Sequence, residues 1–289
     1  MEIGLILPLG DEPGPDVPAS VAEVSAMASQ VEAAGLDSVW VYDHLLSAEG
    51  DGPPEGTWEA WSVLSALAVT TSRVRLGTLV CCTTFRHPGL MAKMAHTVAE
   101  ISGDRLILGL GAGWHEPEYR AFGFPFDHRV ERFAESLEIT ATMLRDGRAT
   151  VSGAYYSVRD APVLPLRAGG ARVPILVGSA GPRMAALVAR WADAWNTAWY
   201  GLPGPKFEER YDLVRAACDE IGRDPSTIDI TVGLILGEQA PRVPLNPDAI
   251  AEALGQWRDR GVSHIIALPD PTTPDAVATL ADGVDQFRR

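Results

Sequence analysis

The sequence is poor in cysteine, has no long apolar run and carries an excess of acidic residues. Only three cysteines occur in 289 residues, and the neighbours Cys81 and Cys82 are not placed for an ordinary relaxed disulfide with each other. We therefore expect a reducing compartment and a cytoplasmic protein. No run reaches the roughly 20 apolar residues that span a bilayer. The first residues, MEIGLILPLGDEPG, also lack the basic and small-residue pattern of a signal peptide.

Positive charge is scarce as well. The chain has 24 lysines and arginines against 38 aspartates and glutamates, a formal net charge of −14. Binding to nucleic acid or to an anionic membrane depends on neutralising phosphate charge, so neither partner is expected. The composition favours a small-molecule partner, and any anionic ligand must be held by local groups such as helix N-termini, backbone amides or a few arginines.

Several motifs that carry known chemistry are missing. The sequence has no His-x-x-x-His, no paired Cys-x-x-Cys and no carboxylate cluster, so we predict no metal site. It has no Gly-x-Ser-x-Gly turn for a nucleophilic serine. Gly109, Gly111 and Gly113 resemble a dinucleotide-binding fingerprint only loosely, because their spacing does not match Gly-x-Gly-x-x-Gly.

What the sequence does contain is a regular alternation of strand-like and helix-like segments. Eight apolar runs are predicted strands: Ile3–Leu7, Ser38–Tyr42, Val74–Val80, Leu106–Leu110, Ile175–Val177, Ala194–Thr197, Ile228–Leu236 and His264–Leu268. Helices are predicted between them over about 19–34, 57–71, 88–102, 127–146, 182–192, 205–221, 247–260 and 274–288. Prolines stand at the expected first helical positions 88, 182, 247 and 274. This pattern predicts a single (β/α)8 TIM barrel over residues 1–289, with a hairpin inserted at about 147–173 before the fifth strand.

Polar and small residues are concentrated after the predicted strands. Asp43-His44 follows the second strand, Thr83–His87 the third, Gly111–Glu116 the fourth and Gly178–Gly181 the fifth. In barrels of this kind the chemistry is carried by the loops at the carboxyl ends of the strands. We therefore predict an active site at that end.

The segments in and around these loops resemble the luciferase-like monooxygenases, and among them the F420-dependent oxidoreductases. The matching segments are Ser38-Val-Trp-Val-Tyr-Asp-His44, Val74–Val80 continuing to Thr84-Phe-Arg-His-Pro88, Arg105–Trp114, Glu118-Tyr119 through Phe122-Gly123, and Val177-Gly-Ser-Ala-Gly-Pro-Arg183. They follow the order seen in the family and cover most of the chain. The resemblance implies a TIM barrel that binds coenzyme F420, with FMN as the alternative cofactor, and a homodimer.

The resemblance also gives roles to Asp43 and His44. It implies that Asp43 contacts the deazaflavin and that His44 is the catalytic acid or base, which suits an imidazole that exchanges a proton near neutral pH. Considered alone, an Asp-His pair is more often a capping aspartate followed by a solvated histidine, and its place at the end of a barrel strand favours the functional interpretation. Arg86 and His87 are expected either to cap the third helix or, for Arg86, to face the cofactor tail.

Two further segments are assigned to the cofactor. The resemblance implies a cis peptide bond between Leu79 and Val80, forming a bulge behind the ring system, while Cys81 and Cys82 are expected to be buried barrel wall. It also implies a cofactor phosphate at Gly178, Ser179, Ala180 and Gly181, where backbone N–H groups open a helix, with Arg183 adding a charged contact. The alternative for this loop is a tight left-handed turn.

The loop after the fourth strand is assigned to both cofactor and substrate. Gly111 and Gly113 are expected to let the backbone approach the flat cofactor, and Trp114 and His115 to line the substrate pocket. Glu116 and Glu118 are interpreted as acidic residues near a helix start. The related F420-dependent sugar-phosphate dehydrogenase has a glutamate where this chain has Trp114, and a tryptophan where this chain has Leu45-Leu46-Ser47-Ala48. A fairly apolar substrate is therefore expected instead of a sugar phosphate.

The predicted function is F420-dependent hydride transfer between the deazaflavin C5 and a small organic substrate. Two alternatives share the predicted site. One is an FMN-dependent monooxygenase that activates O2, and the other is a non-catalytic barrel that only binds a flavin or deazaflavin. The sequence does not specify the substrate or the direction of transfer.

Overall fold

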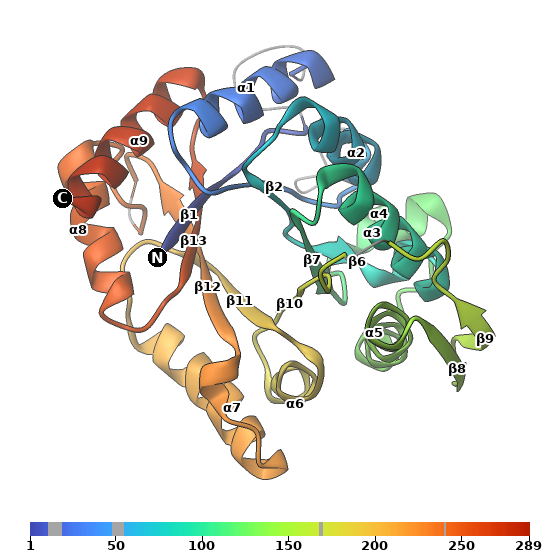
Figure 1. Ribbon diagram of the computed structural model, residues 1–289. Coiled ribbons are helices and arrows are strands. Elements are labelled where there is room, and N and C mark those ends of the chain that lie inside the picture. Colours follow the sequence, from blue (N-terminus) through green and yellow to red (C-terminus); the bar gives the residue numbers. More distant parts are fainter. Residues whose placement is uncertain (11–18, 48–54, 168–169, 240) are drawn as a thin grey trace.

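Eight parallel strands form a closed barrel. The computed structural model describes residues 1–10, 19–47, 55–167, 170–239 and 241–289. The barrel strands are β1 (Glu2–Ile6), β2 (Ser38–Val41), β5 (Arg75–Thr78), β7 (Leu106–Gly111), β10 (Ile175–Gly178), β11 (Ala194–Tyr200), β12 (Asp229–Leu236) and β13 (His264–Pro269). They pair in chain order, β13 pairs with β1, and the pairing of β7 with β10 closes the ring. The predicted TIM barrel is confirmed (Figure 1).

Helices surround the strands on the outside of the ring (Figure 1). They are α1 (Val21–Ala33), α2 (Ala60–Thr70), α3 (Pro88–Ser102), α4 (Glu116–Phe122), α5 (Arg129–Asp146), α6 (Pro182–Trp191), α7 (Pro205–Ile221), α8 (Pro247–Arg258) and α9 (Pro274–Arg288), with short 3-10 turns at Thr83–Phe85 and Pro225–Thr227. Prolines 88, 182, 247 and 274 occupy first helical positions as predicted. A backbone N–H at the first helical position has no partner within the helix, so a proline there loses no hydrogen bond.

The strands are apolar because both of their faces are covered. All six residues of β7 are buried, as expected for a strand between a filled barrel and a helical layer. Inside the barrel, Ile6, Trp40, Ile107, Leu176 and Ile266 pack together. A second, larger layer packs between the outer strand faces and the helices. This filled interior leaves the loops at the two ends of the barrel to form sites.

Three local features differ from the sequence-based prediction. The strand predicted over Val74–Val80 ends at Thr78, before the cis Leu79–Val80 peptide that the resemblance implied, and β6 (Cys81–Cys82) then pairs separately with β7. Helix α4 was not predicted, because its seven residues are too few for a clear periodic pattern. A small ladder of β3 (Leu46–Ser47) and β4 (Glu55–Gly56) was also not predicted.

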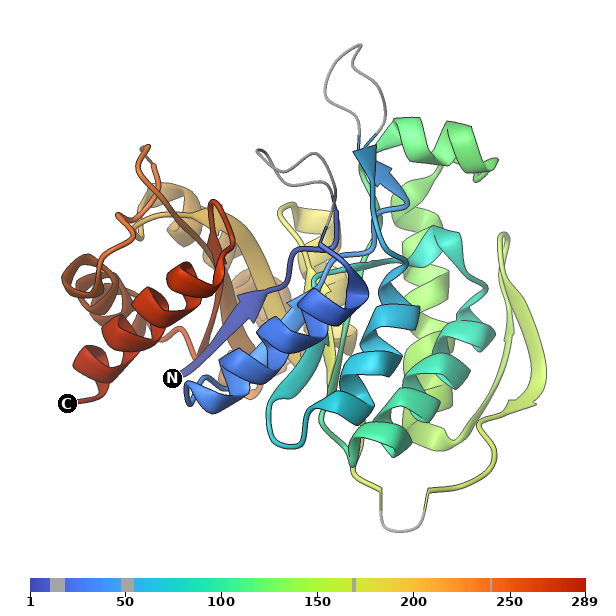
Figure 2. The ribbon, with the colours of Figure 1, turned by 90° about the horizontal axis from the view of Figure 1, so that it is seen from above.

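The inserted hairpin was predicted correctly. It consists of the antiparallel strands β8 (Arg148–Ser152) and β9 (Ser157–Pro162) and lies outside the barrel, beside α5 (Figure 2). Its turn is held by one side chain, because the Glu135 carboxylate on α5 accepts the backbone N–H groups of Ala154, Tyr155 and Tyr156. Hydrophobic contacts of Ala149 with Ile139 and Met143 complete the attachment.

Candidate active site

A cavity of about 780 Å³ opens at the carboxyl ends of the barrel strands. Eleven of the thirteen sequence-predicted site residues line it: Asp43, His44, Leu79, Val80, Gly111, Gly113, Trp114, His115, Gly178, Ser179 and Ala180. Gly181 and Arg183 are not among its lining residues. The loops after β2, β5, β7 and β10 therefore converge, as expected for a barrel whose chemistry lies at this end.

His44 is held by a residue that sequence reasoning did not single out. Its Nδ1 atom lies 3.1 Å from Oε1 of Glu118, and the other carboxylate oxygen accepts the Leu45 N–H at 2.9 Å. The Glu118 side chain is 2% exposed and that of His44 is 27% exposed. Glu118 was predicted as an ordinary acidic residue near a helix start. Its position in the first turn of α4, directly after a site loop, was the available signal.

Asp43 is committed to a buried ion pair. Its carboxylate accepts two hydrogen bonds from Arg86, at 2.6 and 2.9 Å, and a third from the Cys82 N–H at 3.0 Å. Burial raises the pKa of Asp43, against the opposing effect of Arg86 and the Cys82 N–H. The pKa of Arg86 is raised as well, because its carboxylate partners outweigh the effect of burial. Arg86 also bonds Glu59, so it neither caps α3 nor stands unpaired, whereas His87 does cap α3 by accepting the Gly89 N–H.

The wall between Asp43 and the phosphate loop is built around Val80. The Leu79–Val80 peptide is cis, as the resemblance implied, and a second non-prolyl cis peptide joins Ala198 to Trp199 on the cavity wall. Gly111 is required by Val80 itself, since a Cβ there would lie 2.5 Å from Cγ2 of Val80. Gly113 has a φ of +74°, and a Cβ there would lie 1.8 Å from the Tyr119 hydroxyl. Both glycines thus make room for side chains of this chain.

Trp114 and His115 stand beside His44 at the rim. Trp114 is 70% exposed, and its ring meets the His44 imidazole edge to face with centroids 5.6 Å apart. His115 is only 8% exposed and lies 5.9 Å from His44, also edge to face. Its buried Nε2 atom has no hydrogen-bond partner among the described residues. The three rings form one aromatic edge of the cavity.

The loop Gly178–Gly181 does not form a left-handed turn. Neither glycine has a positive φ, and Gly181 is extended with φ −133° and ψ 167°. Gly181 is the N-cap of α6 and makes no side-chain capping bond, so first-turn N–H groups of α6 are left for another acceptor. Arg183 points elsewhere, with Nη2 2.6 Å from Glu131.

Arg210 of α7 is a cavity residue that the sequence did not indicate. Its Nη1 donates to the Thr197 hydroxyl at 2.8 Å and to the Tyr200 hydroxyl at 3.1 Å. No carboxylate pairs with it in the part of the chain that the structure describes. It is the one lysine or arginine among the described residues that line the cavity. The opposite side of the barrel mouth from His44 therefore carries an unneutralised positive charge.

The cysteines are buried, as expected. Cys82 lies on the cavity wall, and its sulfur is 2.9 Å from the Tyr119 hydroxyl, which itself donates to the Ala112 carbonyl. The thiol is therefore the donor to Tyr119. Burial raises the pKa of Cys82 to about 11 and also raises that of Cys81. Both thiols stay protonated at neutral pH and are poor nucleophiles.

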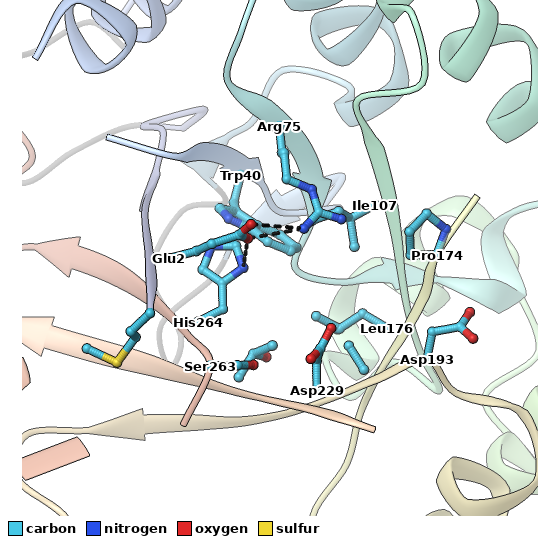
Figure 3. Close-up of a pocket in the computed structure, with 13 residues that line it drawn as sticks. Glu2, Trp40, Arg75, Ile107, Pro174, Leu176, Asp193, Asp229, Ser263 and His264 are labelled. Atoms are coloured by element: carbon cyan, nitrogen blue, oxygen red, sulfur yellow. Dashed lines mark hydrogen bonds and ion pairs between the residues drawn. The ribbon is translucent and has the colours of Figure 1, made fainter. Parts of the chain in front are cut away.

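A second cavity, of about 290 Å³, lies at the opposite, amino end of the barrel strands (Figure 3). Here Nδ1 of His264 lies 3.2 Å from Glu2, and Arg75 lies 3.1 Å from the same carboxylate. Nε2 of His264 lies 2.8 Å from the Ser38 hydroxyl, which accepts the Trp40 indole N–H. A neutral imidazole with its proton on Nδ1 satisfies every one of these bonds. This cluster serves structure, because its polar groups are already paired.

The described residues form neither a metal site nor a membrane-spanning helix. Within them, no group of three or more histidine, cysteine, aspartate or glutamate side chains is arranged to hold a metal ion. Across the same ranges, none of the helices combines the length and apolar character needed to cross a membrane.

The sequence matches one protein-family model, described as luciferase-like monooxygenase, over residues 1–237. Among curated proteins it is 31% identical to an F420-dependent glucose-6-phosphate dehydrogenase of Nakamurella multipartita, over 72% of this chain and 61% of that protein. It is 30% identical to a phthiodiolone/phenolphthiodiolone dimycocerosates ketoreductase of Mycobacterium kansasii, over 80% of this chain and 70% of that protein. The chain thus spans less than two thirds of the length of the dehydrogenase.

Solved structures share the fold at low sequence identity. An F420-dependent secondary alcohol dehydrogenase in complex with an F420–acetone adduct superimposes with a TM-score of 0.83 at 17% identity, covering 100% of this chain and 99% of that one. The F420-dependent tetrahydromethanopterin reductase of Methanopyrus kandleri gives 0.80 at 18% identity, covering 99% of each chain. At these identities the likeness establishes the barrel architecture.

Proposed function

Because this chain belongs to the luciferase-like monooxygenase family, we propose that it is an F420-dependent oxidoreductase acting on an alcohol or carbonyl group. The observation that carries the proposal is His44, an imidazole fixed by a buried carboxylate at the edge of a large cavity. The names of the relatives support it, since they include a dehydrogenase and a ketoreductase, and F420 is named for the first. In such reactions a hydride and a proton move together, so an acid–base group beside the reacting carbon is needed.

The cavity fits a flat ring system that carries an anionic tail. Its volume of about 780 Å³ lies in the range of cofactor sites, and Leu79, Val80 and Ala198 give it apolar walls. The N-terminus of α6, which has no side-chain cap, and Arg210, which has no carboxylate partner among the described residues, would hold a phosphate. Asp43 would contact the deazaflavin ring while it remains paired with Arg86. When bound, F420 supplies the hydride chemistry, and the protein supplies orientation and proton handling.

Nε2 of His44 would accept the proton of the substrate hydroxyl. In the oxidation direction the substrate carbon loses a hydride, its hydroxyl oxygen loses a proton, and the C–O bond becomes C=O. The proton passes to Nε2 of His44, because Nδ1 is occupied by Glu118. In the reduction direction the same imidazole returns the proton to the carbonyl oxygen.

The rim favours a substrate with an apolar body. Trp114 and His115 border the cavity with aromatic faces, and the resemblance places Trp114 at the position of a glutamate in the sugar-phosphate dehydrogenase. An exposed tryptophan offers contact area to an apolar group and no charge to a sugar hydroxyl. We expect secondary alcohols or ketones with apolar substituents to be better substrates than sugar phosphates.

The test is a parallel titration of the purified protein with F420 and with FMN, followed by a screen of secondary alcohols and ketones. We expect tight binding of F420 and turnover of an apolar alcohol or ketone. His44→Gln is expected to keep F420 binding and to lose about 10²- to 10⁴-fold in kcat. His96→Gln, which replaces a half-buried histidine on α3 outside the cavity, is the matched control and should keep full activity.

Two outcomes would replace this function with another. Binding of FMN alone, with oxygen consumption, would make the protein an FMN-dependent monooxygenase. F420 binding without turnover of any alcohol or ketone, unaltered by His44→Gln, would make it a non-catalytic carrier of the cofactor.

A homodimer, implied by the resemblance, belongs to the same proposal. Val69 of α2 and Leu90 and Ile101 of α3 are exposed apolar side chains on neighbouring helices. Multi-angle light scattering measures the mass directly, and a mass near the 30.9 kDa of one chain would rule the dimer out.

A further inference from the structure

Resting on the proposed function, we infer that Glu118 is a positioning residue that sets which nitrogen of His44 faces the substrate. Both oxygens of Glu118 are engaged by the loop after β2, one by the His44 imidazole at 3.1 Å and one by the Leu45 N–H at 2.9 Å. The carboxylate thus binds both a side chain and a backbone N–H of that loop. Nothing else in the described residues bonds the imidazole.

The chemistry of the two partners fixes the position of the proton. An ionised carboxylate only accepts hydrogen bonds, and a neutral imidazole carries one N–H and one lone pair. Nδ1 must therefore hold the proton that is donated to Glu118. The lone pair is left on Nε2, which has no partner in the described part of the chain. His44 lines the cavity, so this lone pair is the base available to a substrate hydroxyl.

Burial makes this arrangement rigid. Glu118 is 2% exposed, and water does not compete for its oxygens. The neighbouring rings of Trp114 and His115 meet the imidazole edge to face at 79° and 88°, which restricts its rotation. The ring is thus held both by hydrogen bonding and by packing.

Glu118→Gln is the sharpest test, because the amide cannot reproduce both contacts. The Leu45 N–H needs an oxygen, so the amide NH2 group is turned toward His44 Nδ1. Nδ1 must then accept, and the proton moves to Nε2, where it blocks the base. We expect kcat to fall by about 10²- to 10⁴-fold with a small change in KM, as when an imidazole is held in the wrong tautomer.

The matched control is Glu116→Gln. Glu116 lies in the same first turn of α4, is exposed, pairs with Arg120 and does not line the cavity. The substitution removes the same charge from the same helix end without touching His44. Its kcat should stay within about twofold of the wild type, as is usual for an exposed site.

The tautomer itself is measured without cofactor or substrate. Long-range ¹H–¹⁵N NMR spectra at alkaline pH, where the imidazole is neutral, distinguish the protonated from the bare ring nitrogen. We expect the proton on Nδ1 in the wild type and in Glu116→Gln, and on Nε2 in Glu118→Gln. Glu118→Asp, which keeps the carboxylate, should keep the wild-type tautomer and guards against a glutamine variant that folds poorly.

The outcomes separate the two proposals. A proton on Nε2 of wild-type His44, or an unchanged tautomer in folded Glu118→Gln, would overturn the role of Glu118 whatever the enzyme does. A tautomer switch in a protein that turns over no substrate with F420 would uphold the role of Glu118 and overturn the proposed function.

Discussion

Two arginines are candidates for the contact with the anionic end of the proposed cofactor. Arg183 follows the small-residue loop directly and was predicted as a contact, but it is exposed, bonds Glu131 and lies outside the cavity lining. Arg210 lies 27 residues further along the chain, lines the cavity and has hydroxyl and carbonyl partners but no carboxylate in the described ranges. An unneutralised guanidinium in a cavity wall makes stronger bonds to an anion than one already paired.

We therefore expect Arg210→Met to weaken F420 binding by about 10- to 100-fold, the loss of one charged hydrogen bond. Binding of the deazaflavin headgroup that lacks the phosphate-bearing tail should be unchanged. Isothermal titration of both ligands measures the difference, with Arg210→Lys as the charge-keeping variant. If Arg183→Met causes the loss and Arg210→Met does not, Arg183 is the phosphate contact. If Arg210→Met weakens the headgroup equally, its effect is on the cavity wall.

At the scale of elements, the hairpin β8–β9 shows how one carboxylate attaches an insertion. Three consecutive N–H groups of its turn converge on Glu135 at 2.7 to 2.9 Å. These bonds lower the pKa of Glu135, although burial acts in the opposite direction. A lowered carboxylate pKa means that the attachment is present at neutral pH and weakens as the pH falls below the ordinary glutamate value.

Glu135→Ala should release the turn without unfolding the barrel. We expect hydrogen exchange of the Ala154, Tyr155 and Tyr156 amides to accelerate by about 10- to 100-fold, the equivalent of one charged hydrogen bond. Exchange in β7 should be unchanged. Glu138→Ala, on the same helix, is the control. Equal acceleration in the barrel strands would show that Glu135 contributes to global stability instead.

At the scale of the whole molecule, the stability of the fold depends on pH through His264, which lies with Glu2 and Arg75 at the amino end of the barrel strands. Burial, with Arg75 and the N-terminal amine, lowers the pKa of His264 to about 3 from its ordinary 6.5. The folded protein keeps this imidazole neutral where the unfolded chain binds a proton. Its contribution to stability is therefore complete above pH 6.5 and is lost progressively as the pH falls toward 3.

We expect the free energy of unfolding to fall by about 1.4 kcal/mol per pH unit below pH 6.5 through this group alone. The difference between the wild-type and His264→Gln slopes from about pH 6.5 to 4.5 isolates the contribution of this group. Urea denaturation across this range should show the slope in the wild type and in His96→Gln, and a flatter curve in His264→Gln. Equal slopes in all three proteins would show that another group controls acid stability.

The sequence by itself determined the barrel fold and the end of the barrel at which the cavity lies. Apolar strands buried on both faces, prolines at helix starts and the small or polar residues after strands are local signals, and they predicted the barrel and the end that carries the cavity. The resemblance supplied most of the thirteen predicted site residues, of which eleven line that cavity. The resemblance added the Leu79–Val80 cis bond, which the structure confirms.

Only the tertiary structure decided which groups partner one another. Glu118 is 74 residues from His44, and Arg210 reaches the cavity from the outer helix α7, so no local pattern links Glu118 to His44 or Arg210 to the cavity. Arg86, predicted either to cap the third helix or to face the cofactor tail, is instead a buried partner of Asp43, 43 residues away. Closing the ring brings these side chains within hydrogen-bond distance, and local sequence preferences carry no record of distances across the barrel. The resemblance thus named His44, the proposed acid–base residue, whereas its buried partner Glu118 emerged only from the tertiary structure.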